Sequence, residues 1–182
     1  MTKALVPLAP GFEEMEGVII VDVCRRAGWS VDTAGLAPGL VKASRGMLVQ
    51  PDLTWDDIDP LSYDVLILPG GAPGTEALMR DQRVLDAIQA FDRAGKWIGA
   101  ICAAALALQA AGILTLNRKV TCHPAVEKKL TTVPRQTART VVDGRLITSQ
   151  GPGTAFDFVL TLIRQIDGPA KAESLSREMV LT

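Results

Sequence analysis

The sequence contains a single histidine, a single tyrosine and only three cysteines. A catalytic zinc ion usually takes three protein ligands, and cysteine and histidine do not cluster here, so we expect no metal. Three widely spaced cysteines, an odd number, do not make a disulfide framework. We therefore expect free thiols and a reducing, cytoplasmic setting.

The chain also lacks blocks of like charge and long apolar runs. Its net charge is −1 over 182 residues, which argues against nucleic acid or an anionic membrane as the main partner. No apolar run approaches membrane-spanning length, and the N-terminus runs directly into a strand pattern, so we expect no signal peptide. The length suits a single domain over residues 1–182, with one substantial core.

Short apolar runs alternate with helical segments along the chain. Expected strands are 4–9, 29–34, 64–68, 97–101, 119–121, 138–142 and 145–149, and expected helices are 13–27, 75–79, 82–94, 103–110, 155–166 and 169–180. This alternation predicts an α/β fold with a parallel sheet covered on both faces. Ligands bind such sheets outside the carboxyl ends of the strands. Three features stand at such ends: residues 10–16, residues 69–71, and Cys102.

Cys102 stands at the junction of the buried strand 97–101 and the helix 103–110, with no loop residues between. Such a junction is a sharp, strained corner, as in the nucleophile elbow of hydrolases. The helix N-terminus favours thiolate, so we expect a lowered thiol pKa. The alternative is a buried small hydrophobe. Cys24 is expected to pack in a helix, and the role of Cys122 stays open.

Two backbone amides and one carboxylate are candidate partners of this cysteine. The Gly71 amide can join the Ala103 amide as an oxyanion hole facing the sulfur; the alternative is a tight turn that needs glycine. Three glutamates, at positions 13, 14 and 16, open the first helix. Either all are solvated charges at the helix N-terminus, or one is carried to Cys102 and buried enough to raise its pKa.

His123 follows an expected strand and precedes Pro124. A lone histidine is more often structural than catalytic. Its place at a strand end, on the same edge as Cys102, keeps a catalytic role open beside the structural one.

Several stretches of the sequence, taken together, resemble one known family over nearly the whole chain. They are Pro10-Gly11-Phe12-Glu13-Glu14-Met15-Glu16, Val21-Asp22-Val23, Arg25-Arg26-Ala27-Gly28, residues 64–71, Ala100-Ile101-Cys102-Ala103, Cys122-His123-Pro124 and residues 148–154. The chain resembles the ThiJ/PfpI superfamily, in the branch of the Parkinson-disease-associated deglycase and the bacterial YajL chaperone.

The resemblance implies a flavodoxin-like, three-layer α/β/α sandwich with a mostly parallel sheet, a homodimer, and no cofactor. It makes Cys102 the nucleophile and oxidisable cysteine, Glu16 the carboxylic acid bonded to it, and His123 the third catalytic member. It makes Gly71 and Ala103 the amide pair. It also places two arginines, Arg26 and Arg45, near the pocket as anion-binding residues.

The resemblance implies a glutathione-independent glyoxalase or protein deglycase, acting on methylglyoxal, glyoxal or their early glycation adducts in carbonyl and oxidative stress. The alternative is a redox-sensing, chaperone-like protein that uses oxidation of Cys102. Peptidase activity is a weaker option, because the peptidase-like branch has a histidine directly after its cysteine and here Ala103 follows. A glutamine amidotransferase is also less favoured. In that family a glutamate stands two residues after the histidine, and here Ala125 stands at that position.

Overall fold

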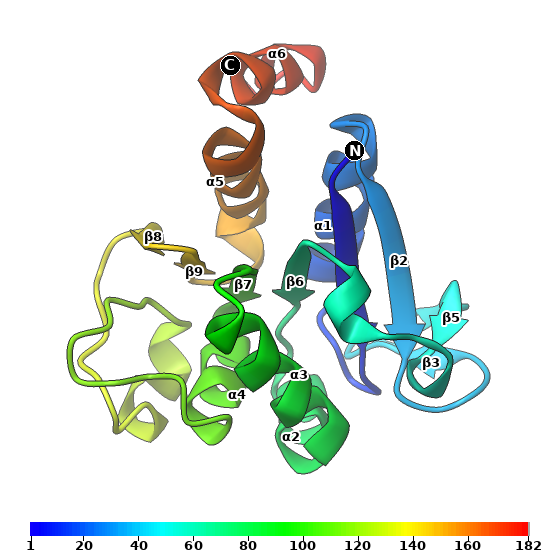
Figure 1. The fold of residues 1–182 in the computed structure, drawn as a ribbon, viewed down its shortest axis with the longest axis vertical. Coiled ribbons are helices and arrows are strands. Elements are labelled where there is room, and N and C mark those ends of the chain that lie inside the picture. Colours follow the sequence, from blue (N-terminus) through cyan, green and yellow to red (C-terminus); the bar gives the residue numbers. More distant parts are fainter. Residues whose placement is uncertain (182) are drawn as a thin grey trace.

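One sheet of seven strands organises the molecule (Figure 1). The structure is a computed structural model that describes residues 1–181. The strand order is β5-β2-β1-β6-β7-β9-β8. The strands are β1 (Lys3–Leu8), β2 (Ser30–Gly35), β5 (Leu53–Thr54), β6 (Val65–Leu68), β7 (Trp97–Ile101), β8 (Thr140–Asp143) and β9 (Leu146–Ser149). All neighbours are parallel except β8 and β9, which form an antiparallel hairpin. A separate small hairpin pairs β3 (Val41–Lys42) with β4 (Leu48–Val49).

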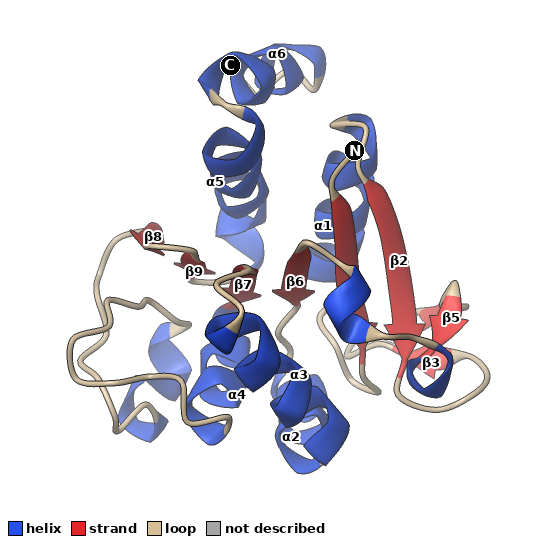
Figure 2. Cartoon of the chain, in the orientation of Figure 1, coloured by secondary structure: helices blue, strands red, loops and turns tan. Residues whose placement is uncertain are grey.

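Helices cover both faces of the sheet (Figure 2). They are α1 (Glu14–Arg26), α2 (Ala72–Arg80), α3 (Gln82–Arg93), α4 (Ala105–Ala110), α5 (Ala155–Asp167) and α6 (Pro169–Glu178). Buried side chains of α1, α5 and α6 form one hydrophobic cluster, and those of α2, α3 and α4 form the other. The expected three-layer α/β/α sandwich is therefore confirmed.

Helix α1 shows why this sequence folds as it does. The Glu13 side chain caps the helix by accepting from the Glu16 amide, acidic residues occupy the first turn, and Arg25 and Arg26 occupy the last. This charge order suits the helix dipole. Its apolar stripe, which includes Ile20, is buried against the sheet. The helix therefore runs back along β1 with its N-terminus at the carboxyl edge of the sheet.

Two expected elements differ from the structure. Residues 119–121 form no strand: Val120 makes one isolated bridge to Arg135, because the Thr121 amide bonds the Thr148 side chain instead of a strand backbone. The helix expected at 103–110 opens with a 3-10 turn at Cys102–Ala104, and α4 begins at Ala105. Within residues 1–181, no helix is long and apolar enough to cross a membrane.

Candidate active site

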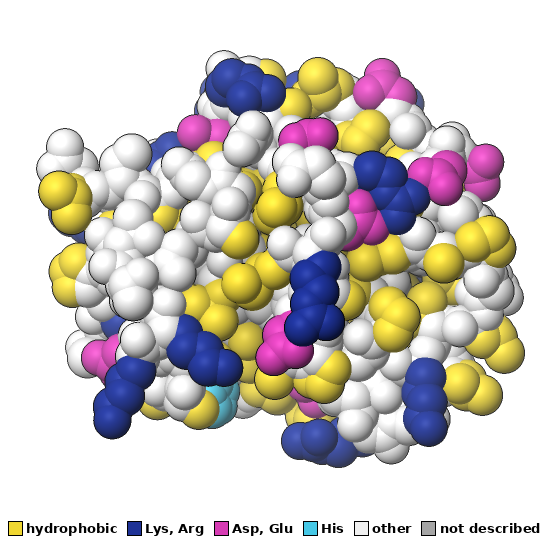
Figure 3. Space-filling model, turned by 90° about the horizontal axis from the view of Figure 1, so that it is seen from below, with side chains coloured by type: hydrophobic (Ala, Val, Ile, Leu, Met, Phe, Trp, Pro, Cys, Tyr) yellow, Lys and Arg dark blue, Asp and Glu magenta, His cyan; other side chains and the backbone are white. Residues whose placement is uncertain are grey.

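The carboxyl ends of the central strands meet at the lower end of the molecule in Figure 1. There β1 leads into α1, β6 leads into Gly70 and Gly71, and β7 leads into Cys102. Seen from below, this end carries hydrophobic side chains between charged ones (Figure 3). The three segments that the sequence places at strand ends therefore converge, as expected for a parallel sheet.

Cys102 has the geometry of a nucleophile elbow. Its φ is 63°, in the left-handed region that costs an L-residue roughly 1–2 kcal/mol. The residue is 9% exposed, whereas Cys24 and Cys122 are 0% exposed. Among the three thiols, Cys102 is thus the one that a small molecule can reach, and Cys24 is core packing as expected.

Glu16 is the glutamate of the first helix that reaches the cysteine. Its side chain is 0% exposed, and Oε2 accepts a hydrogen bond of 2.7 Å from the Gly70 amide. Oε1 has no hydrogen-bond partner within the described residues, and the Cys102 thiol is the neighbouring group that interacts with the carboxyl. Gly70, whose amide role the sequence did not reveal, therefore orients Glu16 and leaves one oxygen for the sulfur.

Burial raises the pKa of both acids. For Glu16 it raises the pKa to about 7, against the lowering effect of bonds from Gly70 and Cys102. For Cys102, burial and then the negative Glu16 raise the pKa to about 12. The expected lowering of the thiol pKa is therefore wrong. At neutral pH the sulfur keeps its proton, and the neighbouring carboxylate is the group placed to take it.

The amides of Gly71 and Ala103 both hydrogen-bond Cys102, and both act to lower its pKa. Gly71 has a φ of 89° and caps α2. A side chain at Gly71 would lie 2.5 Å from the Gly11 carbonyl oxygen and 2.6 Å from the Glu13 amide. The glycine is thus needed both for its turn and for close approach, and it brings an amide to the sulfur.

His123 is joined to Cys102 through the backbone. Its amide donates to the Cys102 carbonyl oxygen at 3.1 Å. Its Nδ1 atom accepts from the Ala125 amide at 3.1 Å, so the neutral imidazole carries its proton on Nε2. The side chain is half-buried. The ring is therefore held in one tautomer, with the Nε2–H group as its remaining donor.

Arg26 and Arg45, the two arginines expected to bind an anion, lie in different parts of the structure. Arg26 lies in the last turn of α1 and pairs with Asp22 at 2.7 Å and Glu178 at 3.6 Å. Arg26 lies ten positions after Glu16 on α1, about 15 Å along the helix axis, so within one chain Arg26 does not reach Cys102. Arg45 lies in the exposed turn before β4, and its amide donates to the Glu14 carboxylate at 2.7 Å.

Within residues 1–181, no group of three or more histidine, cysteine, aspartate or glutamate side chains is placed to hold a metal ion. The Glu16 carboxyl and the Cys102 thiol, two amides and one fixed imidazole make up the reactive groups of this site. Together they supply a proton acceptor, a sulfur nucleophile and donors for developing negative charge.

Comparisons with known proteins show the family and the fold of this chain. A model of the DJ-1/PfpI family matches residues 2–165. The chain is 40% identical to Protein DJ-1 homolog B of Arabidopsis thaliana over 96% of its own length, and spans 40% of that relative. It is 36% identical to the glutathione-independent glyoxalase DJR-1.2 of Caenorhabditis elegans, over 98% of this chain and 96% of that protein. Its structure matches the crystal structure of Drosophila melanogaster DJ-1beta with a TM-score of 0.95 and 36% identity, covering 98% and 97% of the two chains.

Proposed function

This chain belongs to the DJ-1/PfpI family, and from that premise we propose that it is a cysteine-dependent, glutathione-independent glyoxalase. Its substrates are small 2-oxoaldehydes such as methylglyoxal and glyoxal. The observation that carries the proposal is the buried Glu16 carboxyl beside the Cys102 thiol. A carboxylate with a pKa of about 7 is matched to proton transfer at neutral pH.

The first step is attack of sulfur on the aldehyde carbon. Glu16 takes the thiol proton as the C–S bond forms and returns it to the aldehyde oxygen, which gives a hemithioacetal. Because the proton passes to an adjacent carboxylate, the reaction does not require a standing thiolate. The amides of Gly71 and Ala103 face the sulfur and stabilise negative charge that develops beside it.

The second step moves hydrogen between the two carbons. A base removes the proton from the carbon bonded to sulfur, and an enediol forms. Return of a proton to the neighbouring carbon leaves a thioester on Cys102. Water then hydrolyses the thioester to a 2-hydroxy acid and restores the thiol, so methylglyoxal plus water becomes lactate. Glu16 and the Nε2–H of His123 are the two proton carriers proposed for this step.

Release of a dicarbonyl from an early glycation adduct is the deglycase form of the same chemistry. Cys102 is 9% exposed, beside Glu16 at 0% and Ala103 at 4%. A free dicarbonyl fits such a recess more readily than an adduct on a folded protein surface. We therefore propose the free aldehyde as the primary substrate and the deglycase reaction as the second.

Redox sensing through Cys102 is the second candidate function. The raised pKa of Glu16, about 7, leaves a protonated fraction that can donate to an oxygen of a Cys102 sulfinate. The free state of all three cysteines fits the reducing cytoplasm proposed as the location. Peroxide treatment and peptide mass mapping of wild type and Glu16→Gln test this function: equal yields of sulfinate in both would remove its support.

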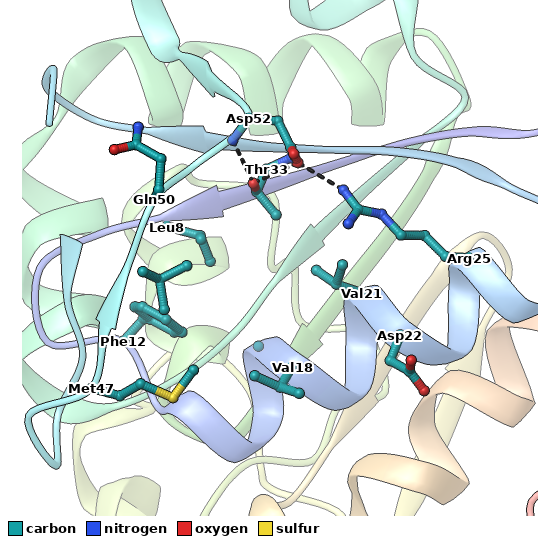
Figure 4. A pocket seen from close by; sticks show the side chains of 12 residues that line it. Leu8, Phe12, Val18, Val21, Asp22, Arg25, Thr33, Met47, Gln50 and Asp52 are labelled. Carbon is teal, nitrogen blue, oxygen red and sulfur yellow. Dashed lines mark hydrogen bonds and ion pairs between the residues drawn. The ribbon is translucent and has the colours of Figure 1, made fainter. Parts of the chain in front are cut away.

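We also propose a homodimer formed through α1 and the β3–β4 hairpin. A cavity of about 290 Å³ opens there; Figure 4 shows Phe12, Val18, Val21 and Met47 around it. Val18 and Met47 are each 47% exposed, and Leu48 on the same hairpin is 60% exposed. A surface that carries both a hollow and protruding apolar side chains can pair with itself about a two-fold axis.

Sedimentation tests the dimer. We expect Val18→Glu to give a monomer, whereas Leu116→Glu, at a residue 84% exposed elsewhere on the surface, stays dimeric. A monomeric wild type would overturn the homodimer.

Lactate formation from methylglyoxal without glutathione tests the enzyme. Wild type is expected to turn over, Cys102→Ser to lose turnover, and Cys24→Ser, a change in a thiol that is 0% exposed, to keep it. The Cys24 variant controls for a contaminating enzyme, because both variants pass through the same purification. Equal lactate from wild type and Cys102→Ser would reject the glyoxalase.

A further inference from the structure

The segment that leads to His123 is held by one isolated backbone bridge and by side-chain hydrogen bonds rather than by a strand ladder. Val120 accepts a bond from the Gln136 amide at 2.8 Å, and the Thr121 hydroxyl donates to the Gln136 carbonyl at 2.7 Å. On its other side the Thr121 amide bonds Thr148 of β9. The place of His123 therefore depends on residues 135–136, which come from a loop that follows it in the chain.

Arg135 is the charged residue in this loop segment. Its side chain is 9% exposed, and Nη1 lies 3.6 Å from the Glu127 carboxylate, whose side chain is 54% exposed. Nε donates to the Cys122 carbonyl oxygen at 2.9 Å. Burying a guanidinium costs desolvation free energy, and attraction to a single partly exposed carboxylate does not fully offset that cost. Stability alone is thus a poor reason for an arginine at this position.

The two contacts of Arg135 fall on either side of His123. Cys122 directly precedes the histidine, and both groups of the peptide bond between them have partners. Arg135 donates to the Cys122 carbonyl oxygen, and the His123 amide donates to the Cys102 carbonyl oxygen. Glu127 lies in the 3-10 turn Pro124–Lys129 that follows. The same turn holds Ala125, whose amide bonds Nδ1 of the imidazole. One guanidinium therefore fixes the backbone before the ring and the turn that orients the ring.

We propose that Arg135 is a positioning residue that holds His123 for proton transfer at Cys102. The inference rests on the proposed role of His123. Arg135 acts through the Cys122 carbonyl and the Glu127 carboxylate and touches no substrate. Its guanidinium fork reaches two acceptors at once, which a lysine ammonium on a flexible stem does with less precision.

The single histidine makes a direct test possible. The imidazole Cε1–H signal in a proton–carbon NMR spectrum of the full chain belongs to His123 alone, and it needs no substrate. We expect Arg135→Met to shift or split this signal and Arg135→Lys to restore part of the wild-type position. Arg139→Gln is the matched control, because Arg139 lies in the same loop but pairs with Asp157 and is 64% exposed; its spectrum is expected to match wild type.

A wild-type His123 signal in Arg135→Met would overturn the proposal. If Arg135→Met does not fold, Glu127→Gln replaces it, because the Glu127 side chain is 54% exposed. A shift in Glu127→Gln supports the proposal, and an unchanged signal in that variant and in Arg135→Lys overturns it.

Steady-state turnover is the second measurement that tests the role of Arg135. We expect Arg135→Met to lower kcat on the order of tenfold by misplacing a proton carrier, with little change in KM. In the His123→Ala background the same substitution is expected to have no further effect on kcat, since the two residues act as one unit. An equal loss in both backgrounds would overturn the proposal. If wild type forms no lactate, the glyoxalase fails, and the NMR arm still judges Arg135.

Discussion

Glu16 and Cys102 meet over the Cα atom of Gly70. A methyl group at Gly70 would lie 2.6 Å from Cβ of Cys102 and 2.8 Å from Oε2 of Glu16. Both side chains thus occupy the space that any other residue at position 70 would fill. The Gly70 amide also orients the carboxyl. The close approach of an acid to a thiol depends on this glycine.

Gly70→Ala is therefore expected to separate the two groups. We expect lactate formation to fall on the order of a hundredfold, as for a displaced catalytic group, while circular dichroism shows a folded protein. Gly153→Ala is the control, because a methyl group there meets nothing within 4 Å. Wild-type turnover in Gly70→Ala would show that the close approach is not needed for the reaction.

The backbone strain at Cys102 is measurable by substitution. Glycine adopts a φ of 63° without the penalty of a side chain, so Cys102→Gly is expected to be about 1 kcal/mol more stable than Cys102→Ala. At Cys24, inside α1, the order reverses, and the alanine variant is more stable by about 1 kcal/mol. Urea unfolding of the four variants gives both differences. The same order at both positions would contradict a strained elbow.

Stability is expected to fall as pH rises, because of Glu16. Its pKa is raised from 4.5 to about 7 in the fold, so the folded state binds more protons than the unfolded state between these values. The protonated Glu16 carboxyl makes its full contribution to the free energy of unfolding below pH 4.5. This contribution, on the order of 3 kcal/mol, is lost by pH 7.

Urea unfolding at several pH values checks this dependence on Glu16. Glu16→Gln is expected to remove the slope, and Glu14→Gln, at a carboxylate whose pKa is lowered, is expected to keep it. The same slope in wild type and Glu16→Gln would place its origin elsewhere.

The three thiols are expected to differ in reactivity. Cys102 is 9% exposed and the other two are 0% exposed, so iodoacetamide labels Cys102 first. The pKa of about 12 makes labelling slow at pH 6, with a rate that rises about tenfold per pH unit.

Substitution of the neighbouring acid should change this rate. In Glu16→Gln the negative neighbour is gone, so the thiol pKa falls and labelling near pH 7 speeds up. Peptide mass mapping measures the rate at each cysteine. Faster labelling of Cys24 or Cys122 in the folded protein would contradict the site.

A buried hydroxyl at the start of α2 offers a stabilising change. Thr75 is 1% exposed, and its Oγ1 has no hydrogen-bond partner within residues 1–181. Thr75→Val is expected to stabilise the protein by about 1 kcal/mol, because it removes an unsatisfied polar group at similar volume.

Thr33→Val is the matched control for Thr75→Val. Thr33 Oγ1 donates to Asp52 at 2.7 Å, so this substitution is expected to destabilise by about 1 kcal/mol. Thermal unfolding compares the two variants. A loss of stability in Thr75→Val would show that the hydroxyl has a partner.

Local patterns in the sequence were enough to determine the alternation of strands and helices, the layers of the sandwich and the elbow at Cys102. An apolar run such as 97–101 followed directly by an alanine-rich segment specifies a strand and a helix without distant contacts. The same reasoning failed at residues 119–121, where the Thr148 side chain takes the bond that a strand partner would have made.

Tertiary structure alone decided where the proton of the site resides. The sequence placed a thiol at a helix N-terminus and so predicted a lowered pKa for Cys102. In the fold, burial and the Glu16 carboxylate, which lies far away in the chain, outweigh the amides and raise that pKa. Burial and charge at an atom depend on which distant segments pack around it. Local sequence patterns record neither, and the same holds for the distance of Arg26 from this site and for the contact of Arg135 with the His123 segment.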